Sequence, residues 1–360
     1  MMTNQDHNLM LRALHLAGLG LNTTTPNPRV GCVIADQHGH IVGEGYHQKA
    51  GEGHAEVNAL ADAGEKARGA TAYVTLEPCC HHGKTGPCTQ ALISAGIQRV
   101  VYAMQDPNPQ VAGEGVRALE QAGVAVAGPL EEEAALRLNA GFVKRMRVGL
   151  PFVRVKTAMS LDGRTAMASG ESKWVTGPAA RADVQRLRAR SCAIVTGVES
   201  VILDDPSLTV RIREGDRQPL RVIVDTRGRC PDTAEILRQP GKTVIACGEH
   251  LQVPDDGRTY WSLPEKQGRV DLYALLRKLA QEQCNEVLVE TGATLAGAFV
   301  ASGLVDELVV YVAGKLMGSS ARPAFTLPID KMSSLLPLSI RDVRAVGEDW
   351  RFTAVPDPDA

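Results

Sequence analysis

Strand-length apolar segments alternate with amphipathic helical segments along most of this chain, in two series separated by one break. The break falls near residue 148, where Gly149 and Pro151 interrupt the pattern. Alternating strands and helices predict an α/β fold, because the connecting helices must cover the faces of the sheet. The 360 residues are also more than one ordinary domain needs. We therefore expect two α/β domains, residues 1–147 and residues 148–360.

The first series predicts an α/β sandwich around a mostly parallel sheet. Apolar residues recur at helical spacing from Asp6 to Gly20, which predicts a first helix. The turn His38-Gly39-His40 between two short strands predicts a hairpin. The expected strands are Val30–Ala35, Ile41–Tyr46, Ala72–Leu76, Arg99–Met104 and Val124–Ala127. The other expected helices are His54–Asp62, Gly86–Ala95, Gly113–Ala122 and a connecting helix, Glu131–Arg145, that is acidic at its start and basic at its end.

The second series contains Val/Ile-rich runs without alternation, such as Val222–Val224, which indicate strands buried on both faces. The expected strands are Phe152–Thr157, Ala193–Thr196, Arg221–Asp225, Thr243–Ala246, Glu286–Glu290 and Leu308–Val312. The expected helices are Pro178–Arg190, Asp271–Gln283 and Thr294–Ser302. The last forty residues suggest no chemistry.

Composition narrows the classes of function. A formal net charge of −2 and 4% aromatic residues argue against a protein that coats nucleic acid. We find no apolar run of the roughly 18 residues that a membrane span needs, and the polar N-terminus lacks a basic leader. Eight cysteines in 360 residues are not a disulfide framework. We expect a cytoplasmic protein without nucleic acid or membrane partners, whose cysteines are metal ligands or buried thiols.

The residues with the clearest chemical meaning are His54, Glu56, Cys79 and Cys88. A catalytic zinc site needs three protein ligands and an open position, together with a carboxylate that moves protons without binding the metal. His54, Cys79 and Cys88 supply one nitrogen and two thiolates, and Glu56 supplies the base. Because His54 stands at the entry of a helix, where it is still partly loop-like, both it and Glu56 can face one pocket. We expect one Zn²⁺ per chain.

A different interpretation of the same residues is a closed structural zinc site. Cys80, His81 or His82 would then be the fourth ligand, and Glu56 would be only an acidic residue at a helix start. This interpretation leaves the position of Glu56, two residues after His54, unexplained.

The residues around the ligands resemble those of a known family. The string Pro78-Cys79-Cys80-His81-His82-Gly83-Lys84-Thr85-Gly86-Pro87-Cys88 is similar to the motif of the riboflavin biosynthesis deaminase, in place of the shorter P-C-x-x-C of other zinc deaminases. Thr25–Gly31 and Gln105–Pro109 also resemble that family. The resemblance implies a cytidine-deaminase-like α/β/α sandwich and makes Asn27 a substrate contact, although Asn27 is also a plausible turn residue between two prolines. For Lys84, His81 and His82 two roles stay open: each is either a substrate contact or an exposed residue of the loop surface.

The short sequence motifs of the second half give weaker evidence of function than those of the first. It contains neither G-x-G-x-x-G nor a P-loop, and the strand-to-helix turn Glu290–Gly297 is by itself only a weak indication of an anion site. Lys156–Arg164, however, resembles the opening of the riboflavin-pathway reductase, which is similar in fold to dihydrofolate reductase. Ser172–Trp174, Asp204–Arg211 and Glu290–Gly297 continue the resemblance. With both halves in order, the chain resembles the bifunctional riboflavin biosynthesis deaminase–reductase family.

The resemblance also implies roles for single residues in the second half. The implied NADPH contacts are Ala158, Trp174, Ser200, Asp204, Thr226, Gly292, Ala293, Thr294, Leu295, Ala296, Gly297 and Ala298. The implied contacts to the phosphorylated substrate are Ser172, Arg188, Leu208, Arg211 and Glu290. Arg188 and Arg211 could fork onto phosphate oxygens, and Glu290 could accept hydrogen bonds from a ring or a sugar. Simpler interpretations are a solvated helix charge for Arg188, turn caps for Asp162 and Asp204, and plain packing for Trp174.

The sequence therefore favours an enzyme with two active sites. The first would deaminate a phosphorylated diaminopyrimidine with zinc, and the second would reduce the ribosyl group of the product with NADPH. The alternatives are a zinc deaminase of a nucleoside or RNA with a non-catalytic binding domain, and a zinc-stabilised interaction protein. A homodimer through the second domain would be ordinary for such an enzyme. The sequence shows no clustered arginine motif for a 2′-phosphate, so the choice of NADPH over NADH depends on the resemblance.

Overall fold

The computed structural model describes residues 2–80, 86–108, 111–213, 215 and 217–357. The chain divides into two compact units, Met1–Gly149 and Leu150–Ala360, each of which is described by itself. Within the described ranges, no helix is both long enough and apolar enough to cross a membrane.

The first unit is built on a five-stranded sheet of order β2-β1-β3-β4-β5. Its strands are β1 (Gly31–Ala35), β2 (Ile41–Tyr46), β3 (Thr71–Val74), β4 (Arg99–Tyr102) and β5 (Ala125–Ala127). The predicted hairpin is confirmed, because β1 and β2 pair antiparallel. β1 also pairs antiparallel with β3, whereas β3, β4 and β5 are parallel. The sheet is thus only half parallel, and the expectation of a mostly parallel sheet is wrong: the hairpin reverses the chain once, and β1 then lies against β3.

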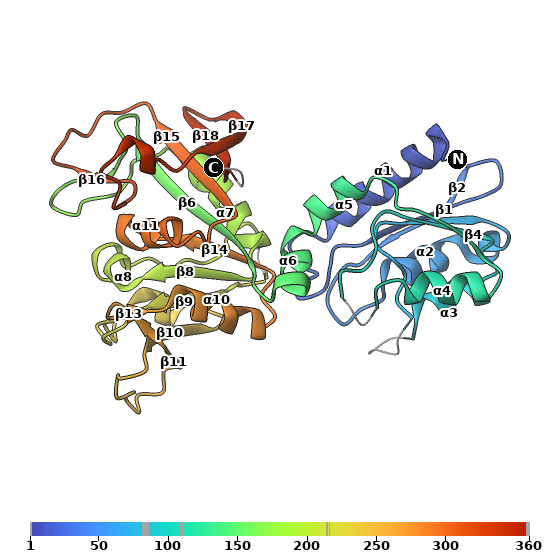
Figure 1. Ribbon diagram of the computed structural model, residues 1–360, viewed down its shortest axis with the longest axis horizontal. Helices are drawn as coiled ribbons and strands as arrows, with labels where there is room; N and C mark the ends of the chain where they lie inside the picture. The colour runs from blue at the N-terminus through green and yellow to red at the C-terminus, as the bar shows by residue number, and fades with distance from the viewer. Residues whose placement is uncertain (1, 81–85, 109–110, 214, 216, 358–360) are drawn as a thin grey trace. The chain divides into compact units, whose positions relative to one another are not determined.

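Helices cover both faces of this sheet (Figure 1). They are α1 (Asn4–Leu19), α2 (Ala55–Ala63), α3 (Cys88–Ser94), α4 (Glu114–Gln121), α5 (Glu132–Leu138) and α6 (Ala140–Val148), with a 3₁₀ turn η1 (Gly64–Ala67). Glycines let two helices approach closely. A Cβ on Gly31 would lie 2.0 Å from the carbonyl oxygen of Ala13 in α1, and one on Gly45 would lie 2.4 Å from the nitrogen of Ala59 in α2. Both faces of β1 are covered, and all five of its residues are buried.

The expected single helix from Glu131 to Arg145 is wrong, since the structure divides it at Asn139. The side chain of Asn139 is buried and bonds the backbone of Arg29 twice, with 2.8 Å from the Arg29 nitrogen to Oδ1 and 2.9 Å from Nδ2 to the Arg29 oxygen. Asparagine favours such side-chain bonds over a regular helix interior, and the long-range pair ends α5 here.

The second unit contains a nine-stranded sheet of order β11-β10-β9-β8-β14-β6-β15-β18-β17. Neighbours from β11 to β15 are parallel, and β18 and β17 add an antiparallel edge. The strands are β6 (Phe152–Ser160), β8 (Ala193–Gly197), β9 (Leu220–Val224), β10 (Thr243–Gly248), β11 (Tyr260–Leu263), β14 (Glu286–Glu290), β15 (Glu307–Ala313), β17 (Leu338–Val346) and β18 (Asp349–Pro356). Two small ribbons, β7 (Arg164–Ala166) with β16 (Arg322–Pro323) and β12 (Glu265–Lys266) with β13 (Arg269–Val270), stand outside the main sheet.

Two hydrophobic clusters fill the two faces of this sheet. Leu275, Leu276 and Phe299 from α10 (Leu272–Gln281) and α11 (Ala293–Ala301) belong to one cluster. The other contains Val184 of α7 (Pro178–Arg190) and Val201 of α8 (Val198–Asp204), with contributions from α9 (Glu235–Arg238). A 3₁₀ turn, η2 (Met332–Ser334), precedes β17. The last forty residues, for which the sequence suggests no chemistry, contain β17 and β18, the antiparallel edge of the sheet.

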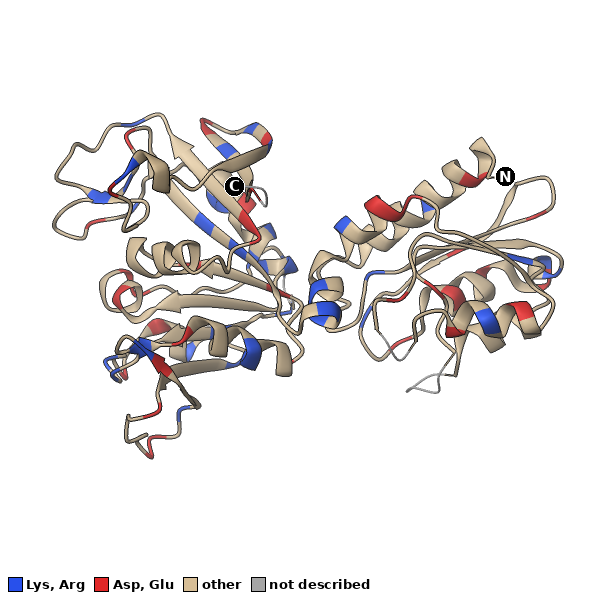
Figure 2. Cartoon of the chain, viewed as in Figure 1, with Lys and Arg blue, Asp and Glu red and all other residues tan. Residues whose placement is uncertain are grey.

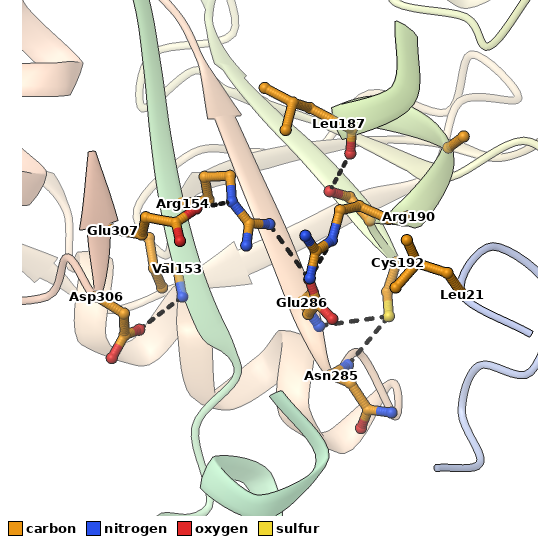
Figure 3. A network of polar contacts seen from close by, with 12 residues as sticks. Leu21, Val153, Arg154, Leu187, Arg190, Cys192, Asn285, Glu286, Asp306 and Glu307 are labelled. Carbon is orange, nitrogen blue, oxygen red and sulfur yellow. Dashed lines mark hydrogen bonds and ion pairs between the residues drawn. The ribbon is translucent and has the colours of Figure 1, made fainter. Parts of the chain in front are cut away.

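A buried ionic network fixes the amino ends of β6 and β14 (Figure 3). Glu286, the first residue of β14, accepts from Arg154 Nη1 at 3.2 Å and from Arg190 Nε at 3.0 Å. Arg154 also pairs with Glu307 of β15. The Cys192 sulfur accepts backbone N–H groups of Asn285 and Glu286. These contacts pin the end of the sheet opposite to the strand ends that form the cleft described below.

Candidate functional sites

His54, Cys79 and Cys88 form one compact cluster in the first unit. Their ligand atoms all lie within 4.8 Å of one another. The His54 Nδ1 is 3.3 Å from the Cys88 Sγ and 3.6 Å from the Cys79 Sγ. Zinc bonded to nitrogen at 2.0–2.1 Å and to sulfur at 2.3 Å in tetrahedral geometry separates such atoms by about 3.5 Å. The three predicted ligands therefore fit a zinc ion without rearrangement.

The local fold explains how the ligands meet. His54 is the N-cap of α2 with an extended backbone (φ −72°, ψ 165°), as expected from its place at the helix entry. Cys79 follows β3, and Cys88 is the first residue of α3 and donates its backbone N–H to the Cys79 sulfur. The pKa of Cys79 is lowered to about 4, first by a hydrogen bond with the Cys88 side chain and then, against its burial, by bonds from His54 and the Cys88 N–H. A thiolate is thus available at neutral pH.

Glu56 lies in the first turn of α2 and is almost completely buried. Burial raises its pKa from 4.5 to about 7. A carboxyl group whose pKa lies near neutrality can both accept and return a proton. Glu56 is not among the three clustered ligands, which agrees with a proton-carrying role.

Asn27 is connected to this cluster through His47, a residue that sequence reasoning missed. Asn27 Nδ2 lies 3.0 Å from His47 Nε2, and the ring of His47 is 5.5 Å from that of His54, edge to face. Burial lowers the pKa of His47. The sequence offers one signal for His47: eight of the nine histidines lie between His7 and His82.

Glu77, two residues before Cys79, is a second missed residue. Its buried carboxylate accepts four backbone N–H groups, those of Asp106, Gly113, Gly115 and Val116, at 2.9–3.2 Å. A Cβ on Gly115 would also lie 2.0 Å from the Pro78 oxygen. The segment before the ligand Cys79 is therefore clamped to the start of α4.

The alternative of a closed four-ligand site finds no support among the described residues. Cys80 is described and is not part of the ligand cluster. His81, His82 and Lys84, whose roles the sequence left open, lie outside the described residues, as does Pro109 of the Gln105–Pro109 string.

The second unit holds a cleft of about 1360 Å³ at the carboxyl ends of its parallel strands. This is the edge at which ligands bind in open α/β sheets. Most of the predicted contact residues line the cleft: Ala158, Ser172, Ser200, Asp204, Leu208, Thr226, Glu290, Gly292, Ala293, Thr294, Leu295 and Ala298. Ala296 and Gly297 do not. Ala296 packs into the core, and a Cβ on Gly297 would lie 2.1 Å from the Thr326 oxygen.

Glu290, the last residue of β14, is held in the cleft by two cations. Arg188 donates Nε to Oε2 at 2.9 Å and Nη2 to Oε1 at 2.8 Å, and Lys156 Nζ lies 3.6 Å from Oε1. Burial alone would raise the pKa of Glu290, but Arg188 and Lys156 lower it to about 2. Arg188 is buried, so its interpretation as a solvated helix charge is wrong. Its guanidinium group binds the Glu290 carboxylate, whereas the expected partner was a phosphate of the substrate. Lys156 also lines the cleft, although it was not predicted to be a site residue.

The turn after β14 fits a cofactor phosphate. Gly292 is the N-cap of α11 with no side-chain cap, which leaves the first N–H groups of the helix open toward the cleft. The Gly292 N–H itself bonds to Ser200 Oγ at 3.1 Å. The adjacent strand β8 ends in the same way, at Gly197 before α8. Two uncapped glycine turns on one cleft are suited to a pyrophosphate.

Of the remaining predicted residues, Trp174 and Arg211 are not among those that line the cleft. Ser172 donates to Asp204 at 2.5 Å, and Arg211 donates Nη1 to Ser207 and Thr209. Trp174 is 64% exposed, so plain packing is wrong for it, and the Arg181 guanidinium lies 4.6 Å from the centre of its ring. Asp162 accepts backbone N–H groups from Met317 and Gly318, as a turn cap would.

Comparison with known families assigns a model to each half. Residues 3–104 match the cytidine and deoxycytidylate deaminase zinc-binding region. Residues 151–352 match the RibD C-terminal domain.

Curated relatives and solved structures match along nearly the whole chain. The riboflavin biosynthesis protein RibD of Escherichia coli strain K12 is 52% identical, over 96% of this chain and 98% of that protein. RibD of Haemophilus influenzae is 46% identical over 98% of both chains. The structure of Acinetobacter baumannii RibD superposes with a TM-score of 0.92 at 48% identity, over 98% of this chain and 99% of that one. A deaminase/reductase from Thermotoga maritima gives 0.88 at 31% identity, with the same coverage.

Proposed function

The chain belongs to the RibD family of riboflavin biosynthesis proteins, and we propose that the residues assembled above carry out the two reactions of that family. It is a bifunctional enzyme. It deaminates 2,5-diamino-6-ribosylamino-4(3H)-pyrimidinone 5′-phosphate and then reduces the ribosyl side chain of the resulting aminouracil to ribityl. It uses Zn²⁺ for the first reaction and NADPH for the second. A nucleoside or RNA deaminase with a non-catalytic second half does not account for the match of residues 151–352 to the RibD C-terminal domain.

We assign the deaminase to residues 1–147, with His54, Cys79 and Cys88 as the zinc ligands. Zinc, when bound there, activates a water molecule for attack on the amino-bearing ring carbon. Glu56 takes a proton from that water and delivers it to the departing amine, so that ammonia leaves. Its burial and its pKa of about 7 suit both transfers. Asn27 and its partner His47 stand beside the cluster, where they can orient the pyrimidine.

We assign the reductase to residues 148–360, with its substrate at Glu290 and its cofactor along the turn that begins at Gly292. NADPH, when bound, supplies the hydride, so the chain has to position both molecules and exclude water. Arg188 fixes the Glu290 carboxylate, which accepts hydrogen bonds from the ribosyl group, while Lys156 adds a positive charge beside it. Ser172, Leu208 and Arg211 are the other assigned substrate contacts.

The observation that carries this proposal is the separation of the two sites between two compact units, each with a complete set of side chains. A two-step assay tests it on the zinc-loaded full chain. Ammonia release from the pyrimidine substrate should proceed without NADPH. NADPH should then be oxidised only by the deaminated product. NADPH oxidation with the undeaminated substrate, in the absence of ammonia release, would contradict the assignment.

We further propose that the enzyme acts in the cytoplasm as a homodimer and has no nucleic-acid partner. In support of a dimer, β17 forms the open edge of the large sheet, and Leu338, Ile340, Val343 and Trp350 of β17 and β18 expose large apolar side chains. The mass of the full chain in solution, and its reduction by Ile340→Lys, test this assembly. A monomer at micromolar concentration would contradict it.

A further inference from the structure

The loop between α1 and β1, residues 20–30, carries Asn27, the residue assigned above to orient the pyrimidine. None of the residues from 20 to 30 belongs to a helix or a strand. Within the loop, the Asn27 N–H bonds to the Thr24 oxygen at 2.9 Å, and Thr24 Oγ1 bonds to the Gly20 oxygen at 3.2 Å. A segment of turns is not held by a helix or sheet ladder, so contacts from elsewhere in the chain have to fix the position of Asn27.

One such contact comes from the connector, which we define as α5 and α6 with Asn139 between them, and it reaches the loop at Arg29. The buried amide of Asn139 accepts the Arg29 N–H on Oδ1 at 2.8 Å and donates Nδ2 to the Arg29 oxygen at 2.9 Å. Arg29, also buried, donates Nη1 to the Leu138 oxygen at 2.8 Å, which satisfies a carbonyl that the end of α5 leaves free. Its Nε and Nη2 bond to the Leu21 oxygen, in the same loop, at 3.3 and 3.2 Å. The connector and the loop are therefore bonded to each other in both directions.

A second contact from the connector reaches the loop on the other side of Asn27. Arg145 of α6 donates Nη2 to the Pro26 oxygen at 3.3 Å. α6 contains Lys144, Arg145 and Arg147 and no acidic residue, and Figure 2 shows the Lys and Arg colour on it. Positive charge near the end of a helix complements the helix dipole, and this accounts for the exposed Arg147. Arg145 is half-buried and contacts the loop as well.

Asn27 thus lies between two backbone positions, Pro26 and Arg29, that the connector holds. We propose that Asn139 and Arg145 are positioning residues of the deaminase, which fix the loop so that the Asn27 side chain stays beside His47 and the zinc ligands. The inference rests on the proposed role of Asn27 as a substrate contact. Neither Asn139 nor Arg145 belongs to the ligand cluster, so their effect is on substrate binding and not on the metal. The connector is then a part of the deaminase site as well as the link to the second unit.

Steady-state ammonia release by the zinc-loaded full chain tests the proposal. Asn139→Ala removes both bonds to the Arg29 backbone and should raise KM for the pyrimidine substrate about tenfold, with kcat changed less than about twofold. Arg145→Ala removes one bond and should raise KM about threefold, and Arg145→Lys, which keeps a donor, should recover part of that loss. Bound zinc should stay at one per chain, and NADPH oxidation with the deaminated product should be normal.

A double-mutant cycle with Asn27→Ala distinguishes positioning from a general loss of stability. If Asn139 acts through Asn27, the variant that combines Asn27→Ala with Asn139→Ala should have the KM of Asn27→Ala alone, because a loop without Asn27 has no contact left to position. Increases in KM that multiply in the double variant would overturn the proposal. The same cycle with Arg145→Ala has the same two outcomes, and it replaces the first if Asn139→Ala does not fold.

Tyr73→Phe is the matched control for Asn139→Ala. It removes another buried bond of the same unit between residues far apart in the chain, from the Tyr73 hydroxyl to Asp6 at 2.8 Å, at the start of α1, whereas the loop follows the end of α1. It should lower the thermal stability and leave KM unchanged, and Arg147→Ala, the control for Arg145→Ala, should also leave KM unchanged. An equal rise of KM in Tyr73→Phe would overturn the proposal.

The variants also separate the failure of this inference from the failure of the proposed function. If Asn27→Ala raises KM and neither Asn139→Ala nor Arg145→Ala does, the inference alone is wrong. If Asn27→Ala leaves KM unchanged, Asn27 is not a substrate contact, and its assignment fails together with the inference.

Discussion

The two sites of this enzyme are built in different ways. In the first unit the proposed zinc ligands and Glu56 all come from residues 54–88, and we propose that the Glu56 side chain itself carries the proton. In the second unit Lys156, Arg188 and Glu290 come from two strands and a helix spread over residues 156–290. There the reacting group belongs to the cofactor, and the side chains position it. In this chain the residues of the acid–base site are therefore close together in the sequence. The residues of the site that aligns substrate and cofactor are far apart in the sequence, and the sheet brings them together.

This difference predicts that single substitutions are far more damaging in the first site. Glu56→Gln keeps the shape of the side chain but cannot carry the proton, so ammonia release should fall by about 10³-fold. Bound zinc, measured by metal analysis, should stay at one per chain, and NADPH oxidation should be normal when the deaminated product is supplied. Retained ammonia release would remove Glu56 from the mechanism.

In the second site the loss should be smaller. Glu290→Gln removes the charge that Arg188 and Lys156 hold, and we expect kcat/KM for NADPH oxidation to fall about 100-fold, while ammonia release is unchanged. Glu286→Gln is the matched control. It lies on the same strand, is even more deeply buried and is also clamped by arginines (Figure 3), but at the opposite end of the strand. It should reduce stability and leave the kinetics of the folded enzyme intact. Equal kinetic losses in both variants would mean that Glu290 is only structural.

The lowered pKa of Glu290 gives the second site a pH dependence. A carboxylate whose pKa falls from 4.5 to about 2 on folding stabilises the native state above pH 4.5, and this contribution is lost as the pH falls toward 2. Between pH 5 and pH 3 the wild type should lose about 2 kcal/mol more unfolding free energy than Glu290→Gln. Urea unfolding of both proteins measures the difference, and loss of zinc from the first unit affects both alike. A constant difference from pH 5 to pH 3 would show that Glu290 is not paired as described.

The smallest effect is expected at the Glu77 clamp, which supports the zinc cluster but is not part of it. Glu77→Gln replaces one of the acceptor oxygens of the clamp by a donor, which should loosen the segment that leads to Cys79 and weaken zinc binding about tenfold. Competition with a chelator measures it, and Glu65→Gln, an exposed residue of the same unit, is the control. If zinc affinity does not change, the clamp serves the fold alone.

The sequence predicts most of what is local. The hairpin of β1 and β2, the strand β14 and the zinc ligands follow from alternation, apolar runs and motif spacing. The division of α5 from α6 does not, because the contact that causes it joins Asn139 to Arg29, far away in the chain. β17 and β18 escaped prediction because their exposed, two-sided edge lacks a clear apolar alternation.

Contacts between residues far apart in the chain also limit how much of the two sites can be predicted from the sequence. Arg188 looks like one charge among several on a helix until the fold brings it to Glu290. His47 and Glu77 act through partners that the chain places beside them only after folding.

The most direct measurement of the central claim is the stoichiometry of the two reactions on the wild-type, zinc-loaded chain. Ammonia and NADPH would be followed together after addition of the diaminopyrimidine substrate. Two sites that act in order predict that ammonia appears first, that NADPH oxidation follows with a lag, and that one NADPH is consumed for each ammonia released. NADPH consumption that precedes ammonia, or that continues when Glu56→Gln has stopped ammonia release, would contradict the account.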